Sequence, residues 1–374
     1  MSKAAELAAL ISSQTALSDR SMIINGAMQV AQRATSSTST GYCSLDRFRI
    51  QPLNTDQLAY TFAQDDTVPA GEGFSKSAKI SITTAEDSVA DNEIFRLLHR
   101  IEGQNMQRAS WGTSSAKPLT LSFFVRSNVT GTYALEFRMN AGGNNSLSKN
   151  YTINSADTWE RKTITFPKNT STNFINDNTE GCELGWYLAA GANYTSGSLA
   201  SDYGANATNT RAAGQTANIT SSSSNTWYIT GVQLEVGEQA TPFQHRSFED
   251  ELARCHRYTT VYPPADVTAE FKYAIPQSSN VCDVANRPEV TIFYPEKRAD
   301  PTITHIGNTT SDWRVGLANN TNLTPTGISQ AVGNSRRGSV FFITVSSGVS
   351  TNSLSGVACY FYSNGGRIVV DAEL

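Results

Sequence analysis

The chain has 374 residues, 17% of them charged and 39% hydrophobic, with a formal net charge of −4. The charged share lies below the usual quarter, and Ser, Thr, Asn and Gly are correspondingly frequent, which is typical of β-sandwiches with polar loops rather than of helical enzymes. The negative balance gives no reason to expect a face that binds nucleic acid or an anionic membrane. The length predicts two or three domains, and either half can bury its own core.

The cysteines predict neither a zinc site nor a disulfide framework. They are odd in number, scattered, and free of any CxxC spacing: Cys43, Cys182, Cys255, Cys282 and Cys359. This pattern fits folding in a reducing cytoplasm. The N-terminal apolar run is interrupted at Ser12 and Ser13, unlike a signal peptide, and no run approaches the length of a transmembrane helix, so we expect no membrane insertion.

Residues 1–21 are predicted to form a helical segment for anchoring or oligomerisation. Over Ser2–Leu17, one helix face gathers four small or apolar residues: Ala4, Leu7, Ala8 and Ile11. Such a helix is too short to be stable alone in water, so it must pack on something. It could lie on its own domain. We favour self-association about a symmetry axis, or docking onto a larger particle, because a stripe of small residues ahead of a β domain suits a bundle.

Residues 22–243 are predicted to form a β-sandwich, because short alternating strands follow one another between polar turns. The best strand candidates are Leu45–Ile50, Gln57–Phe62, Ala78–Thr83, Leu119–Arg126, Thr132–Met139, Glu160–Phe166, Glu183–Ala189 and Trp227–Glu235. The phrase Ile94–Glu102 has helical spacing and is ambiguous. Two long loops are expected, at Asn140–Asn150 and Gly191–Ser224, and loops of this length are usually functional, disordered or part of an interface.

Residues 244–260 are predicted to form a linking helix. Ser247 supplies a capping hydroxyl, acidic residues fill the next turn, and apolar residues follow. On this helix, Cys255 is expected in the core, and His256 is expected to interact with the negative end of the helix dipole.

Residues 261–374 are predicted to form a smaller C-terminal β-sandwich domain. Its expected strands are Glu270–Ile275, Glu289–Tyr294, Thr302–Ile306, Trp313–Leu317, Ser339–Val345, Gly356–Tyr362 and Arg367–Ala372. The protein is therefore expected to be mainly β, with a short N-terminal helix and one linking helix.

No catalytic constellation is present in the sequence, and we expect no enzyme activity. The four histidines, His99, His245, His256 and His305, have no HExxH or GxSxG partners. The neighbouring acids are Asp65-Asp66, Glu86-Asp87 and Asp91 with Glu93. Adjacent acids in polar loops are more often solvated, whereas a glycosidase usually takes its carboxylates from different strands. No metal ligand set is predicted: calcium would fit an acidic loop, but the chain has no EF-hand pattern.

Sugar recognition has the most physical support among binding functions. A sugar's CH face stacks on aromatic rings while polar side chains satisfy its hydroxyls. The candidates are Trp186, Tyr187, Tyr194, Tyr203 and Arg211 in the first domain and Trp313 in the second. The position of Trp186 within a strand favours a core role. For Tyr194 and Tyr203, in the long loop, sugar contact and a subunit interface remain open alternatives.

Several phrases of the sequence resemble a family of bacteriophage virion proteins, mostly tail fibres and tail-associated proteins. They are GVQLE-x-G at Gly231–Gly237, TPF at Thr241–Phe243, LARC-x-RY at Leu252–Tyr258, NGAMQVAQR at Asn25–Arg33, LDRF at Leu45–Phe48, PEKRADP at Pro295–Pro301 and the final DAEL at Asp371–Leu374. These matches bracket nearly the whole chain. The resemblance implies a carbohydrate-binding-module-like jelly roll followed by a smaller β domain, with Ile94–Glu102 as a strand. Related jelly rolls often bind calcium.

The resemblance also implies a function and a location. We expect a virion protein assembled in the bacterial cytoplasm, as a homotrimeric tail fibre or spike that attaches to a host-surface glycan. Other virion proteins would bind its N-terminal end. A head fibre or capsid-decoration protein is an alternative. A monomeric carbohydrate-binding module or polysaccharide depolymerase is another, and a convergent, titratable carboxylate pair in a cleft would support it.

Overall fold

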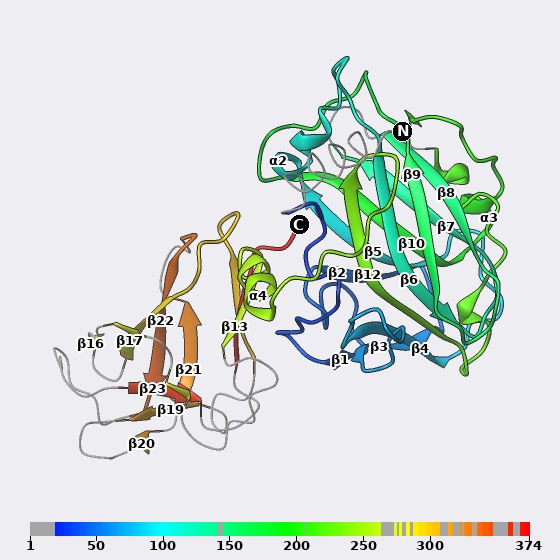
Figure 1. Ribbon diagram of the computed structural model, residues 1–374. Helices are drawn as coiled ribbons and strands as arrows, with labels where there is room; N and C mark the ends of the chain where they lie inside the picture. The colour runs from blue at the N-terminus through cyan, green and yellow to red at the C-terminus, as the bar shows by residue number, and fades with distance from the viewer. Residues whose placement is uncertain are drawn as a thin grey trace. The chain divides into compact units, whose positions relative to one another are not determined.

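The computed structural model describes residues 19–140, 145–205, 207–262, 273–274, 277–278, 282–284, 287–306, 313–316, 322–323, 325–330, 335–346, 358–361 and 367–374. The chain is mainly β, as predicted (Figure 1). It divides into two compact units. Unit 1 comprises Met1–Ala31, Ser36–Glu251 and Leu374, and unit 2 comprises Gln32–Thr35 and Leu252–Glu373. The predicted anchor residues Ala4, Leu7, Ala8 and Ile11 lie outside the described residues.

Unit 1 is a sandwich of two antiparallel sheets. Sheet 1 has the strand order β1-β3-β4-β12-β6-β9, and sheet 2 has the order β11-β8-β7-β10-β5-β2. The strands of sheet 1 are β1 (Ser36–Ser37), β3 (Ala59–Asp65), β4 (Ser77–Thr84), β6 (Leu119–Ser127), β9 (Glu160–Phe166) and β12 (Thr226–Val236). Those of sheet 2 are β2 (Phe48–Leu53), β5 (Ile94–Glu102), β7 (Gly131–Met139), β8 (Asn145–Ile153), β10 (Glu180–Ala190) and β11 (Gly204–Ala205).

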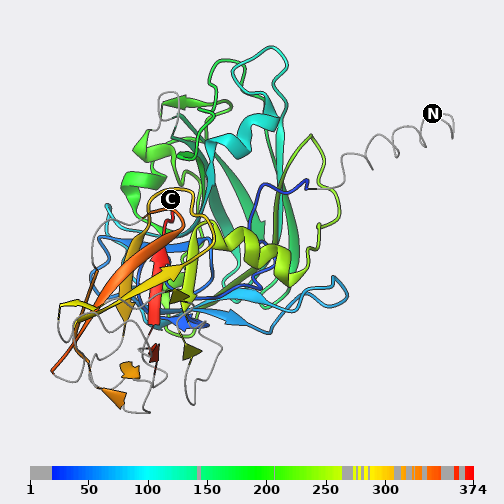
Figure 2. The same ribbon diagram turned by 90° about the vertical axis from the view of Figure 1, so that its left-hand side faces the viewer.

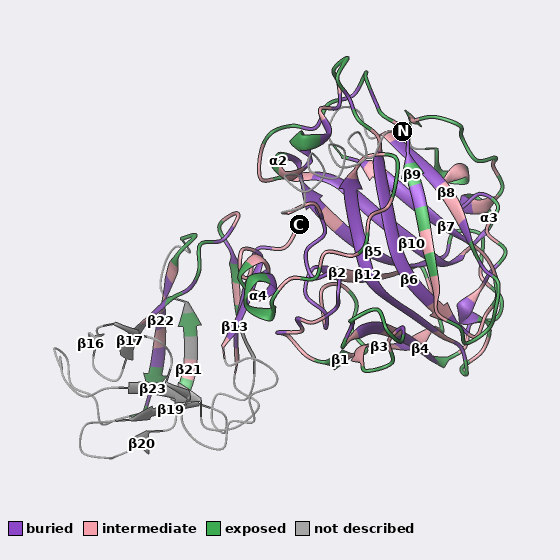
Figure 3. Cartoon of the chain, viewed as in Figure 1, coloured by how far each residue is buried: buried purple, intermediate pink, exposed green. Residues whose placement is uncertain are grey.

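The core of unit 1 lies between the two sheets, where the strands are buried along most of their length (Figure 3). Trp227 of sheet 1 and Trp186 of sheet 2 are both 0% exposed. Phe123 of β6 meets Trp186 of β10 edge-on, with 5.9 Å between ring centroids. Because side chains alternate along a strand, every second residue of sheet 2 points to the opposite, outer face. That outer face carries the candidate site.

Strands β5 and β8 lie where the sequence was ambiguous or predicted a loop. Ile94–Glu102, ambiguous by its spacing, is strand β5, as the resemblance implied. The loop expected over Asn140–Asn150 was wrong for its second half, because Asn145–Asn150 opens β8. These polar residues form a strand because they pair with β7, with Ser146 opposite Arg138 and Ser148 opposite Glu136. The described residues of the Gly191–Ser224 region are mostly irregular and form short elements: α3 (Ala192–Thr195), β11, η2 (Thr208–Thr210) and η3 (Ile219–Ser221).

The GVQLE and TPF phrases form a clamp on sheet 1. Glu235 of β12 accepts hydrogen bonds from the amide and the hydroxyl of Thr241, at 2.8 and 2.7 Å. Gln233 accepts one from the Gln244 amide at 2.8 Å. Both β12 side chains are buried, so their polar groups require such partners. The phrases therefore fix the chain where it leaves the sandwich.

The NGAMQ and LDRF phrases form a second clamp. Asn25 is fully buried with a left-handed backbone (φ 61°), and its side-chain amide donates to the carbonyls of Val30 and Asp46 at 2.8 and 2.9 Å. The next residue must be glycine, since a Cβ on Gly26 would lie 2.1 Å from the carbonyl oxygen of Val232. The two phrases therefore serve packing within unit 1.

The predicted linking helix is α4 (Phe248–His256), visible in yellow-green in Figure 2. As expected, the Ser247 hydroxyl accepts a hydrogen bond from the Asp250 amide, at 3.1 Å, and Cys255 is fully buried. The expectation for His256 was wrong. Burial and the nearby Lys297 ammonium lower the pKa of His256 to about 4, so the imidazole is neutral at pH 7. Lys297 instead donates to the His256 carbonyl and supplies the cation at this helix end.

Unit 2 is built from short antiparallel strands. Its described strands form three groups, with orders β13-β24-β18, β14-β23-β19-β20 and β15-β17-β22-β21, and β16 pairs with β17. They are β13 (Thr259–Tyr262), β14 (Tyr273–Ala274), β15 (Gln277–Ser278), β16 (Cys282–Val284), β17 (Arg287–Phe293), β18 (Thr302–Ile306), β19 (Trp313–Gly316), β20 (Asn322–Leu323), β21 (Pro325–Gln330), β22 (Gly338–Val345), β23 (Ala358–Phe361) and β24 (Arg367–Asp371). Within this unit Arg33 forms ion pairs with Asp371 and Glu373 at 3.0 and 3.5 Å, which joins the NGAMQVAQR and DAEL phrases.

Candidate functional site

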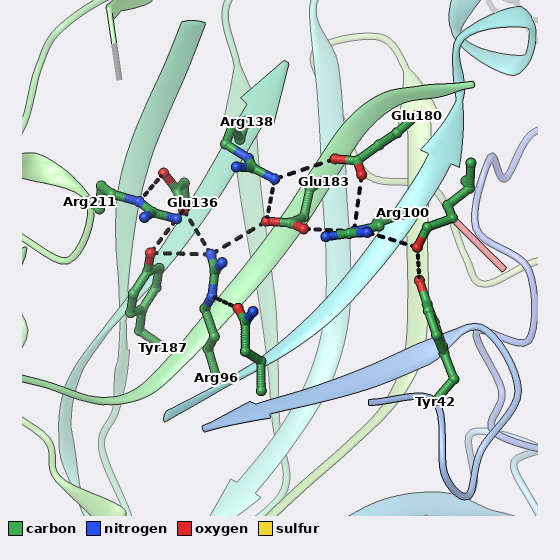
Figure 4. A network of polar contacts seen from close by, with 11 residues as sticks. Tyr42, Arg96, Arg100, Glu136, Arg138, Glu180, Glu183, Tyr187 and Arg211 are labelled. Atoms are coloured by element: carbon green, nitrogen blue, oxygen red, sulfur yellow. Dashed lines mark hydrogen bonds and ion pairs between the residues drawn. The ribbon is translucent and has the colours of Figure 1, made fainter. Parts of the chain in front are cut away.

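The outer face of sheet 2 carries a network of arginines and glutamates, shown in Figure 4. The strand register places these side chains side by side: Glu183 of β10 lies opposite Arg100 of β5 on one side and Arg138 of β7 on the other. The neighbouring residues Cys182 and Leu184 belong to the sandwich core, so Glu183 points away from it. We call this set the sheet-2 network: Arg96, Arg100, Glu136, Arg138, Glu180, Glu183, Tyr187 and Arg211.

Glu183 lies at the centre of the sheet-2 network. Its carboxylate is 2.8 Å from Arg100 Nε, 3.1 Å from Arg138 Nη2 and 3.4 Å from Arg96 Nη1, and the side chain is 1% exposed. Burial alone would raise the pKa of Glu183, but the three guanidinium groups hold it below the ordinary value. A charged carboxylate in this position is stable only because cations surround it.

Glu136 forms a second centre. Arg211, from the long loop after β10, binds both of its carboxylate oxygens at 2.9 Å, and Tyr187 donates its hydroxyl to Oε2 at 2.9 Å. Burial tends to lower the pKa of Arg211, but the bond to Glu136 outweighs it and raises the pKa. Arg96 Nη1 reaches the same carboxylate at 3.2 Å and so links the Glu136 and Glu183 centres.

At the other end, Glu180 lies 3.1 Å from Arg100 Nε and 3.4 Å from Arg138 Nη2. Burial raises the pKa of Glu180, more than these arginines lower it. Arg100 Nη1 also donates to the main-chain oxygen of Leu374 at 2.7 Å, which accepts a second bond from the Tyr42 hydroxyl at 3.2 Å. The network thus runs from the 191–215 loop to Leu374.

The chemistry of this face is that of polar recognition. Guanidinium groups donate in a planar fork, carboxylates accept, and Arg100, Arg138 and Arg211 each keep 14–19% of their side chains exposed. Gly185, with no side chain, lies on β10 between the Glu183 and Tyr187 positions. Such a surface can hold a ligand rich in hydroxyl or anionic groups, with a sheet as its rigid support.

Among the residues predicted to contact sugar, the structure corrects the placing of the aromatic rings. Trp186 is 0% exposed in the core, so its ring is not available for stacking. Tyr194 is 8% exposed and packs with Tyr187 and Ala212 over one end of the outer face. Tyr203 is partly buried against the core, and its hydroxyl donates to the Pro167 carbonyl at 3.1 Å. The polar composition of the loop predicted exposed rings at Tyr194 and Tyr203. In the structure both rings pack against the sandwich and attach the loop to it.

Arg211 and Trp313 are the other two residues predicted to contact sugar. Arg211 does lie in a polar constellation, through its paired bonds to Glu136. Trp313 begins strand β19 of unit 2, and its side chain lies outside the described part of the chain.

Sequence reasoning missed most of the sheet-2 network. The available signal was charge inside predicted strands: Arg96 and Arg100 on β5, Glu136 and Arg138 on β7, and Glu183 on β10. Within β5 and β7 these charges stand at even spacings among apolar residues, which puts them on one face of each strand. Only the register between strands, which the sequence does not give, shows that they meet.

Four of the six neighbouring acids named from the sequence bond to residues close by in the chain or in the fold. Asp65 and Asp66 form ion pairs with Lys79 and Lys76, at 3.3 and 2.5 Å. Glu86 accepts the Asp56 amide at 3.1 Å, and Glu93 accepts the Ala90 amide at 2.7 Å. Among the described residues, no group of three or more His, Cys, Asp or Glu side chains is placed to hold a metal ion. In the same part of the chain, every helix is too short or too polar to span a bilayer.

Comparison with known proteins gives likenesses of structure alone. No family model and no curated protein matches the sequence. A sugar-binding protein from Bacteroides thetaiotaomicron, described as putative, matches with a TM-score of 0.32 and 12% identity, over 58% of this chain and 100% of its own. The tailspike protein 4 enzymatically active domain of bacteriophage CBA120 has the same TM-score and identity, over 58% of this chain.

This chain spans only 21% of that tailspike domain. A family 11 carbohydrate-binding module of a Clostridium thermocellum cellulase matches with a TM-score of 0.28 and 8% identity, over 56% of this chain and 98% of its own. At these TM-scores the likenesses do not identify a ligand. The site therefore has to be judged by its own residues.

Proposed function

We propose that this chain is a structural protein of a phage virion, a homotrimeric tail fibre or spike, that attaches to host-surface glycan through the outer face of sheet 2. The observation that carries the proposal is the sheet-2 network, a lattice of guanidinium, carboxylate and phenol groups on a rigid sheet. Its buried carboxylates, Glu136 and Glu183, hold the partly exposed guanidinium groups of Arg100, Arg138 and Arg211 at fixed spacing, where they can donate to a polyhydroxylated ligand. Among the described residues, no other face of unit 1 gathers as many linked charges.

The phage assignment rests on the sequence phrases that resemble virion proteins. In the structure these phrases act as clamps: Glu235 with Thr241, Asn25 with Asp46, and Arg33 with Asp371. Because these phrases bond to partners elsewhere in the chain, the whole set supports the resemblance more strongly than any single phrase does. The proposed role is binding without catalysis. Three weak sites on one particle would gain avidity without a tight single contact.

Glycan binding can be tested on an array of bacterial surface polysaccharides probed with the labelled full chain. Arg138→Ala is expected to weaken binding about tenfold or more, since a charge-assisted hydrogen bond is worth about 1.5–3 kcal/mol. Arg161→Ala removes an exposed guanidinium from β9 of sheet 1 and is the matched control. Equal binding by wild type and a folded Arg138→Ala protein would contradict the proposed site.

Assembly is tested separately, by light scattering on the full chain. The proposal expects a mass three times the 40.5 kDa of one chain. A mass of 40.5 kDa at all concentrations would favour the monomeric binding-module alternative, unless assembly requires the virion. Electron microscopy of virions labelled through the chain would then distinguish a tail from a head position.

A further inference from the structure

Arg49 is an arginine of sheet 2 that the sheet-2 network does not use. It lies on β2 between Phe48 and Ile50, both 0% exposed in the core, so its own side chain is on the outer face. The register places it opposite Leu98, with Arg96 and Arg100 two residues away on either side along β5. Arg49 is half-buried, at the edge of the network near Tyr42.

The guanidinium of Arg49 has no hydrogen bond or ion pair to any other described residue. Each of its neighbours does: Arg100 binds Glu183 at 2.8 Å, and Arg96 binds Glu136 at 3.2 Å. Burial and then the charge of Arg100 lower the pKa of Arg49, and the Glu183 carboxylate offsets only part of this effect. Because Arg49 is only half-buried, its guanidinium is open on one side to an anionic group of a ligand.

The balance of charges on the outer face of sheet 2 also favours an anionic ligand. Five guanidinium groups lie on this face, from Arg49, Arg96, Arg100, Arg138 and Arg211, against four carboxylates, from Glu102, Glu136, Glu180 and Glu183. The main-chain oxygen of Leu374 offsets part of the charge at Arg100 but makes no bond to Arg49. This local excess of positive charge contrasts with the net charge of −4 of the whole chain.

We propose that Arg49 anchors an anionic substituent of the glycan, a uronic carboxylate or a sulfate or phosphate ester. The planar guanidinium fork matches two oxygens of such a group, and a neutral sugar would leave the charge without a partner. Gln51, two residues along the same face and bonded to Arg96 at 2.8 Å, is placed to meet neighbouring hydroxyls. This inference rests on the proposed function, since it names the class of glycan that the sheet-2 face takes.

The test is calorimetric titration of the full chain with sulfated dextran, oligogalacturonate and neutral dextran. At least one anionic probe is expected to bind tenfold or more tightly than neutral dextran, and to weaken as salt is added. Arg49→Ala and Arg49→Gln are expected to lose about tenfold to a hundredfold of that affinity, while Arg161→Ala keeps it. Both Arg49 variants should keep the wild-type Tm, because Arg49 makes no internal bond whose loss would matter.

Results that contradict the role of Arg49 can be told apart from results that contradict the proposed function. Unchanged affinity in both Arg49 variants, equal loss in Arg161→Ala, or no preference for anionic probes overturns the inference. If the polysaccharide array still shows a glycan whose binding needs Arg138 and not Arg49, the inference fails and the proposed function stands. If the array shows no binding at all, both fail.

Discussion

Replacing Glu183 by glutamine is expected to destabilise unit 1 by about 3–5 kcal/mol, the range for removing one partner of a buried ion pair. The side chain is 1% exposed and faces Arg96, Arg100 and Arg138, so the substitution leaves three cations without this counter-charge. Chemical denaturation of the full chain gives the change in the free energy of unfolding. Glu72→Gln, at an exposed position, is the control and is expected to have little effect.

The effect of Glu183→Gln should depend on pH in a defined direction. Because the folded-state pKa of Glu183 is lowered, its stabilisation is fully present above the unfolded value near 4.5 and is lost as pH falls through the folded value. The gap in Tm between wild type and variant should therefore stay constant above about pH 5.5 and narrow below pH 4.5. The pKa of Glu180 is raised instead, so Glu180 adds its own pH dependence to the stability of both proteins. Comparing wild type with Glu183→Gln isolates the part that comes from Glu183. A gap that widens in acid would contradict the ion-pair account.

Replacing Trp186 by alanine is expected to cost about 3–5 kcal/mol, the range for a buried aromatic ring in a core. The ring is fully buried and packs edge-on against Phe123 from the opposite sheet. Phe248, 48% exposed on α4, offers the control, and Phe248→Ala is expected to change stability little. A folded Trp186→Ala protein that keeps its Tm and loses only glycan binding would restore the sugar-contact hypothesis for this residue.

The sequence was sufficient for the strands and insufficient for the site. Alternation along Leu119–Arg126 and Trp227–Glu235 predicts β6 and β12 closely, because one face of each strand must be apolar. Polar strands were harder: Asn145–Asn150 looked like a loop, and only its pairing with β7 makes it a strand. Local composition cannot report a partner that lies elsewhere in the chain.

The same limit explains the aromatic residues. Tyr194 and Tyr203 stand in a loop rich in small polar residues, where exposure is the natural expectation. The structure folds that loop back, so that Tyr194 packs on Tyr187 and Tyr203 lies against Trp111. The same loop places Arg211 against Glu136, a contact between residues 75 positions apart. Sites built by register and loop return are invisible to motif searches, whereas clamps such as Gln233 with Gln244 are near enough in sequence to read as a phrase.

The most direct test of the account is hydrogen-exchange mass spectrometry of the full chain with and without the glycan that binds it best. The account predicts slower exchange on binding in peptides that cover β2, β5, β7 and β10, the strands of the sheet-2 network and Arg49. Peptides of sheet 1, such as Glu160–Phe166 and Thr226–Val236, should be unchanged. Protection confined to sheet 1 or to unit 2 would contradict the assignment of the glycan site to the outer face of sheet 2.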